Sequence, residues 1–102
     1  MRFGLLDDYA VVPWYTSEES YQQFRMSAVD CDDFFDRFDH WIDAAMAHER
    51  AAELRGVVIF RVRMSFPDFQ AWCHTHGRVN DNQSRSAFAE YRAAQLMSWK
   101  SD

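Results

Sequence analysis

The sequence predicts an α+β fold, with a small two- or three-stranded sheet packed against about four helices in the order β-α-α-β-α-α. Two segments, 1–15 and 57–64, have β-like patterns of apolar residues. The rest of the chain has the periodicity of apolar residues and the capping residues that are typical of helices. Because 102 residues is a common size for one domain, we expect residues 1–102 to form a single compact domain, with the helices on one face of the sheet.

The first β-like segment, residues 1–15, includes Phe3, Leu5 and Leu6 before a second apolar group that begins at Tyr9. Whether Asp7-Asp8 forms a hairpin turn stays open, because no glycine supports a tight turn there. Pro13 cannot donate a ladder hydrogen bond, so this segment is expected at a sheet edge or to end before the proline.

A short helix is expected next. Thr16 and Glu19 have the spacing of a capping box, which predicts a helix from Thr16 to about Ala28. Its apolar side carries Tyr21, Phe24 and Ala28.

Residues 30–56 predict one long amphipathic helix, around which the rest of the chain is organised. Asp30 is a plausible N-cap, and Gly56 is the residue type expected just beyond the last turn. At 100° per residue, the inner face collects Phe34, Phe38, Trp41, Ala45 and Ala52.

The outer face of this helix carries an acidic stripe, defined as Asp32, Asp36, Asp39 and Asp43. The simpler interpretation is a solvated face. However, helices usually offset like charges with cations one turn away, and the first cation in line with the stripe is Arg50. The four aspartates are therefore the candidate partner-binding residues, with a basic protein surface as the partner. Mimicry of nucleic acid would also need Asp7, Asp8, Glu18 and Glu19, because the stripe is sparser than a phosphate backbone.

The segment 57–64 predicts the clearest strand. Val58, Phe60, Val62 and Met64 alternate onto one face, and Arg61 and Arg63 lie on the other. A strand needs a pairing partner for its backbone, and residues 1–15 are the candidate within this chain.

Two helices complete the prediction. Ser65 caps a helix that Gly77 ends, with a core face of Phe66, Phe69, Trp72 and Cys73. Asn80 or Asp81 caps a final helix to about Lys100. That helix has two apolar bands. One band contains Phe88, Tyr91 and Trp99, and the other contains Ala89, Ala93, Leu96 and Met97. One of the two bands can therefore face a second copy of the chain.

Charge and motifs narrow the function classes. The net charge is −5, whereas a general nucleic-acid binder carries a basic face. The two helices around Gly77 also suggest a helix-turn-helix, so a DNA-binding accessory protein stays as an alternative, using Arg61, Arg63, Arg78, Arg85 and Arg92.

No catalytic Ser/His/Asp motif and no glycine-rich phosphate loop is found, which argues against an enzyme. His74 and His76 would point about 160° apart on a helix, so they do not share an ion easily. Asp36, His40 and Asp43 lie on adjacent turns of the predicted helix, but a solvated face is favoured over a weak metal site. We therefore expect no metal and no cofactor.

Cys31 and Cys73 are too few for a disulfide framework and are expected as buried thiols. With no signal-like or membrane-spanning stretch, the expected location is the cytoplasm. The function expected is a small acidic, non-enzymatic protein-binding module, such as an inhibitor or immunity-type protein of phage or mobile-element origin. The alternatives are a homodimeric regulatory or structural module and the DNA-binding accessory protein.

Overall fold

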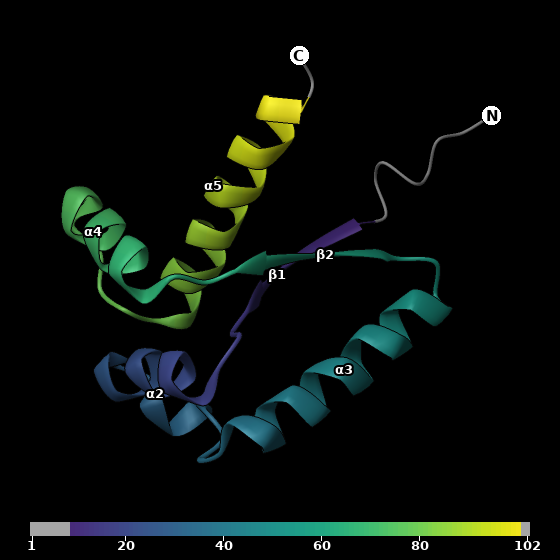
Figure 1. Ribbon diagram of the computed structural model, residues 1–102, viewed down its shortest axis with the longest axis horizontal. Helices are drawn as coiled ribbons and strands as arrows, with labels where there is room; N and C mark the ends of the chain where they lie inside the picture. The colour runs from purple at the N-terminus through teal and green to yellow at the C-terminus, as the bar shows by residue number, and fades with distance from the viewer. Residues whose placement is uncertain (1–8, 101–102) are drawn as a thin grey trace.

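The predicted α+β architecture is confirmed. The computed structural model describes residues 9–100, with side chains as far as Met97. The expectations for Phe3, Leu5, Leu6 and the Asp7-Asp8 turn lie outside these residues. The order is the predicted one, with a short 3-10 helix added (Figure 1): β1 (Tyr9–Trp14), α2 (Glu18–Ser27), η1 (Cys31–Asp33), α3 (Phe38–Leu54), β2 (Val58–Arg63), α4 (Phe66–His76) and α5 (Asn82–Lys100).

The sheet in the described part of the chain consists of β1 and β2, paired in parallel from Tyr9 opposite Val58 to Trp14 opposite Arg63. The predicted pairing of the two β segments is thus confirmed. Parallel strands require a long crossover connection, and α2, η1 and α3 supply it. Pro13 lies within β1, opposite Val62. A proline is tolerated there because, among residues 9–100, β1 pairs only with β2.

Helices cover both faces of this sheet, so the expectation of helices on one face is wrong. Val62 is buried in the core cluster that includes residues of α4 and α5. Its neighbour Arg61 points the other way and donates to both carboxylate oxygens of Glu49 in α3, at 2.9 and 2.7 Å. The Arg61 guanidinium also lies 3.7 Å from the centroid of the Trp14 ring. The strands therefore run between α3 and α5 (Figure 1).

The core is predominantly aromatic. The apolar side predicted for the first helix is confirmed, since Tyr21, Phe24 and Ala28 are all buried. Phe69 and Cys73 of α4 are buried as predicted. Phe66 and Trp72 are partly buried and pack against the same cluster. Cys31, in contrast, is exposed, so the expectation of two buried thiols is wrong for that residue. The buried cluster consists of Tyr15, Tyr21, Phe24, Val62, Met64, Phe69, Cys73, Phe88, Ala89 and Ala93.

Most predicted helix ends are confirmed. Ser65 Oγ accepts a hydrogen bond from the Asp68 N–H, and Gly77 ends α4 in the left-handed region at φ 63°. Gly56 follows α3 at φ 86°. The N-cap of α2 is Ser17 instead of Thr16, because the Ser17 hydroxyl accepts from the Ser20 N–H at 3.1 Å.

The helix predicted for residues 30–56 begins only at Phe38, so the first eight residues of that prediction are wrong. The Phe35 carbonyl accepts from the Tyr21 hydroxyl at 2.9 Å, and the Asp36 carbonyl accepts from the Gln22 amide at 3.0 Å. Side chains of α2 therefore bind carbonyl groups that a continuous helix would use for its own hydrogen bonds. Residues 34–37 form a connection between η1 and α3.

None of the helices in the described region combines the length and the apolar character that a membrane crossing requires.

Candidate protein-binding surface

The four predicted partner-binding residues are all exposed, but they do not share one helix. Asp32 lies in η1, Asp36 lies in the connection before α3, and Asp39 and Asp43 lie in the first part of α3. The prediction of one helical stripe is therefore wrong in its geometry. Asp33 is also exposed. We call residues 32–43, with these five carboxylates, the acidic segment.

Two of the five carboxylates have cationic partners, contrary to the expectation of an acidic stripe without nearby cations. Arg25 of α2 donates to Asp36 Oδ1 at 2.9 Å, and Arg37 forms a two-pronged ion pair with Asp39. The Arg37 hydrogen bonds lower the pKa of the Asp39 carboxyl. The Asp36 side chain remains 88% exposed, so its ion pair is a surface pair. Surface pairs contribute about 0–1 kcal/mol and exchange partners easily.

The other three carboxylates, Asp32, Asp33 and Asp43, have no cation within ion-pair distance among residues 9–97. They leave the acidic segment with a negative surface after its two ion pairs are counted. A face of this kind attracts basic groups over a distance of about 8–10 Å at physiological salt.

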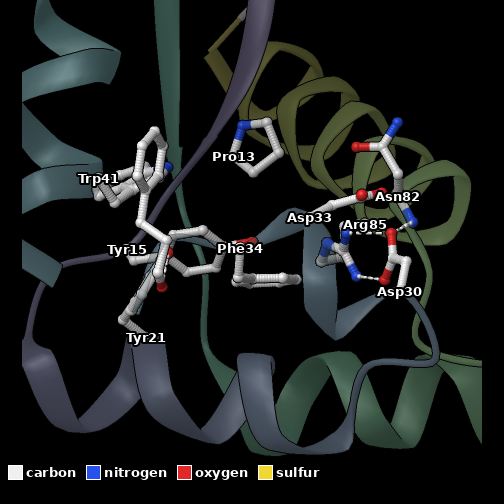
Figure 2. A pocket seen from close by; sticks show the side chains of 10 residues that line it. Pro13, Tyr15, Tyr21, Asp30, Asp33, Phe34, Trp41, Asn82 and Arg85 are labelled. Carbon is white, nitrogen blue, oxygen red and sulfur yellow. Dashed lines mark hydrogen bonds and ion pairs between the residues drawn. The ribbon is translucent and has the colours of Figure 1, made fainter. Parts of the chain in front are cut away.

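An aromatic pocket of about 310 Å³ opens beside the acidic segment (Figure 2). Four residues belong to both features: Asp33, Phe34, Phe35 and Trp41. In Figure 2, Trp41, Tyr15 and Tyr21 gather at one end of the pocket, and Asp30, Arg85 and Asn82 lie at the other, with Phe34 between them. Its lining is Pro13, Tyr15, Tyr21, Asp30, Asp33, Phe34, Phe35, Trp41, Asn82 and Arg85.

A buried ion pair forms the polar end of this pocket. Arg85, which is 5% exposed, donates to both oxygens of Asp30 at 3.0 and 2.8 Å and to Asn80 Oδ1 at 2.8 Å. Asp30 Oδ2 also accepts from the Asn82 N–H at the start of α5. The hydrogen bonds from Arg85 lower the pKa of the Asp30 carboxyl. Asp30 was predicted to cap the helix of residues 30–56, but its carboxylate binds the N-terminus of α5 instead.

Tyr15 belongs to the aromatic end and lines the pocket. It is 5% exposed, and its hydroxyl forms no hydrogen bond with any residue that the structure describes. Burial raises the pKa of Tyr15 to about 12, so the hydroxyl stays protonated at neutral pH. The pocket therefore holds a neutral hydroxyl that can donate or accept a hydrogen bond.

Two of the five arginines of the DNA-binding alternative are held in ion pairs with carboxylates, whereas Arg63 is exposed. Arg85 is buried against Asp30, and Arg61 is paired with Glu49. Arg78 donates to the Ser84 hydroxyl, and Arg92 donates to the Gln95 amide oxygen. The expectation that the last helix would present Arg85 to a ligand is therefore wrong.

The weak metal site considered for Asp36, His40 and Asp43 does not have the expected geometry. Asp36 is outside α3, so it does not share a helical face with His40 and Asp43. Within the described residues, no group of three or more His, Cys, Asp and Glu side chains is arranged to hold a metal ion.

Sequence reasoning missed the Asp30–Arg85 pair and the pocket above it. One signal was present, because Arg85 shares the helical face of Phe88 and Ala89, at spacings of three and four residues. An arginine on an apolar face predicts a buried carboxylate partner. The partner itself could not be chosen from the sequence, since Asp30 is 55 residues away.

Comparisons with known protein families, with curated proteins and with solved structures find no match.

Proposed function

We propose that this chain is a small, non-enzymatic protein-binding module whose acidic segment engages a basic surface of another protein. The observation that carries the proposal is the exposure of five carboxylates within residues 32–43, directly beside an aromatic pocket. Protein interfaces combine such features, with an aromatic centre and a polar rim.

The charge arrangement supports the same role. Asp32, Asp33 and Asp43 are available to cations of a partner, and the surface ion pairs of Asp36 and Asp39 cost little to exchange. Complementary charges speed the encounter of two proteins and suppress wrong partners. An inhibitor or immunity-type protein of phage or mobile-element origin, acting in the cytoplasm on a basic target, would work in this way.

Affinity capture from cells of the source organism tests the proposal. The test variant carries Asp32→Asn, Asp36→Asn, Asp39→Asn and Asp43→Asn. The control variant removes four exposed carboxylates elsewhere, through Glu19→Gln, Glu53→Gln, Asp68→Asn and Glu90→Gln, and changes the net charge equally. Circular dichroism checks that both variants are folded. The wild type and the control should retain the same basic protein, and the test variant should lose it. Equal retention by all three would contradict the proposal.

A second candidate function, a homodimeric module, is favoured by an apolar groove along α5. The groove is lined by Tyr9, Ala10, Val11, Glu90, Ala93, Ala94 and Met97. Of the two predicted apolar bands, Phe88, Ala89 and Ala93 are buried, whereas Tyr91, Leu96 and Met97 are exposed; the side chain of Trp99 lies outside the described residues. A second copy of the chain could cover this groove through its own α5.

Sedimentation at micromolar concentration should then show a dimer. Met97→Glu should shift the protein to a monomer, because it would bury a charge in the apolar contact. Met26→Glu is the matched control, since Met26 is 80% exposed on α2 and away from the groove. A wild-type protein that stays monomeric at all concentrations, as it would if residues of its own chain cover the groove, would contradict the homodimer.

A further inference from the structure

The pocket beside the acidic segment is selective in charge. Its lining holds two carboxylates, Asp30 and Asp33, and one guanidinium, Arg85. Arg85 is committed to Asp30 and Asn80 through three hydrogen bonds. The Asp33 carboxylate has no ion-pair partner among residues 9–97, so it would repel an anion and attract a cation. The pocket therefore favours a positively charged occupant.

The aromatic lining fits the same occupant. The half-buried rings of Phe34 and Trp41 offer negative π faces to a cation and apolar surface to an aliphatic stem. Among the described residues, arginines of this chain already lie over aromatic rings in this way. Arg85 lies 4.6 Å from the Phe34 ring centroid, and Arg61 lies 3.7 Å from that of Trp14. Lysine and arginine both combine an apolar stem with a cationic head group.

The Tyr15 hydroxyl is the second independent observation. It is a polar group on a residue that is 5% exposed, it lines the pocket, and it has no hydrogen-bond partner among the described residues. A tyrosine hydroxyl that lacks a protein partner can accept an N–H from an occupant of the pocket.

We infer that this pocket receives a lysine or arginine side chain of the basic partner, with the aliphatic stem against the aromatic rings and the head group near Asp33 and the Tyr15 hydroxyl. The inference rests on the proposed function and specifies how the partner is recognised. The volume of about 310 Å³ is at the lower end for a small-molecule site, and a single long side chain suits it.

Titration of the isotope-labelled full chain with amino-acid probes, followed by NMR, tests the inference. The probes are N-acetyl-arginine amide and N-acetyl-lysine amide, with the uncharged N-acetyl-norleucine amide as the control. At least one cationic probe should shift the Trp41 indole N–H and the amides of Phe34 and Phe35 saturably, with a roughly millimolar Kd. No saturable shift, or equal shifts from the norleucine probe, would overturn the inference.

Two variants locate the cation. Asp33→Asn should raise the Kd of the cationic probe by about threefold or more, because it removes the Asp33 carboxylate from the pocket. Asp68→Asn changes the net charge equally but lies on α4, outside this lining and outside the acidic segment, and it should leave the Kd within about twofold. Both residues are exposed, so folding should be preserved. Equal weakening by the two variants would mean that the probe responds to the general negative field, and it would overturn the assignment to the pocket.

The captured partner separates failure of this inference from failure of the proposed function. Phe35→Ala and Asp33→Asn should each weaken partner binding if a basic side chain enters the pocket. The four-aspartate variant is the Asp→Asn test variant of the affinity capture. If Phe35→Ala and Asp33→Asn bind the partner normally and the four-aspartate variant does not, the inference falls and the proposed function stands. If the probes bind in the pocket but the four-aspartate variant captures the partner normally, the proposed function falls instead.

Discussion

Replacement of Asp30 by alanine is expected to lower the free energy of unfolding by about 3–5 kcal/mol. The change leaves the guanidinium of Arg85, a residue only 5% exposed, without its carboxylate partner. It also removes the acceptor for the Asn82 N–H at the start of α5. Denaturant unfolding followed by circular dichroism measures the loss. Asp36→Ala is the matched control, because it removes a surface partner of Arg25 and should cost less than about 1 kcal/mol.

The effect of Asp30 should depend on pH. The pKa of the Asp30 carboxyl is lowered in the folded protein by the hydrogen bonds from Arg85, below a value of about 3.9 in the unfolded chain. As the pH falls, the unfolded state therefore takes up this proton before the folded state does. The stabilisation is lost as the pH falls towards and through the lower pKa of the folded state. The difference between wild type and Asp30→Ala should be full at neutral pH and should shrink below about pH 4. A loss under about 1 kcal/mol at neutral pH would contradict the role given to this pair.

Phe24→Ala is the other large change, with an expected loss of about 3–5 kcal/mol in the free energy of unfolding. Phe24 is fully buried, and its ring centroid lies 5.0 Å from those of Tyr15 and Phe66 and 5.2 Å from that of Phe69. It thus joins α2 to α4 and to the end of β1, and its removal leaves a cavity that the rigid neighbouring rings cannot fill.

Denaturant unfolding also measures the effect of Phe24→Ala, and Phe35→Ala is its control. Phe35 is the same residue type but is 45% exposed, so its loss should cost much less. Similar losses for the two variants would mean that the core is not centred on the cluster described.

Local signals explain which parts of the fold could be predicted from the sequence. Ser65, Gly77 and Gly56 mark helix ends through their own backbone preferences, and the structure confirms all three. The alternation of residues 57–64 likewise revealed β2, since period two is a local property. Of the predicted face, Val62 and Met64 are buried, whereas Val58 is exposed. The parallel direction of the strands was not predicted.

Tertiary hydrogen bonds explain what could not be predicted. Helical periodicity runs through residues 30–56, but Tyr21 and Gln22 bind the carbonyls of Phe35 and Asp36 and exclude them from α3. These contacts join residues 14 apart, so no local window contains them.

The candidate site shows the same division between local and distant signals. The four aspartates are exposed, as the helical spacing predicted, although Asp32 and Asp36 lie outside α3. However, the partner of Asp36 is Arg25 in α2 and the partner of Asp30 is 55 residues away, so neither pairing follows from spacing.

The association rate constant of the captured partner, measured against ionic strength, tests the proposed role of the acidic segment most directly. Stopped-flow or surface-plasmon measurements would compare wild type with the variant carrying Asp32→Lys, Asp36→Lys, Asp39→Lys and Asp43→Lys. The wild-type rate constant should fall steeply with salt, and at low salt the variant should associate at least about tenfold more slowly. A folded variant that associates at the wild-type rate, with no dependence on salt, would show that the acidic segment is only a solvated face.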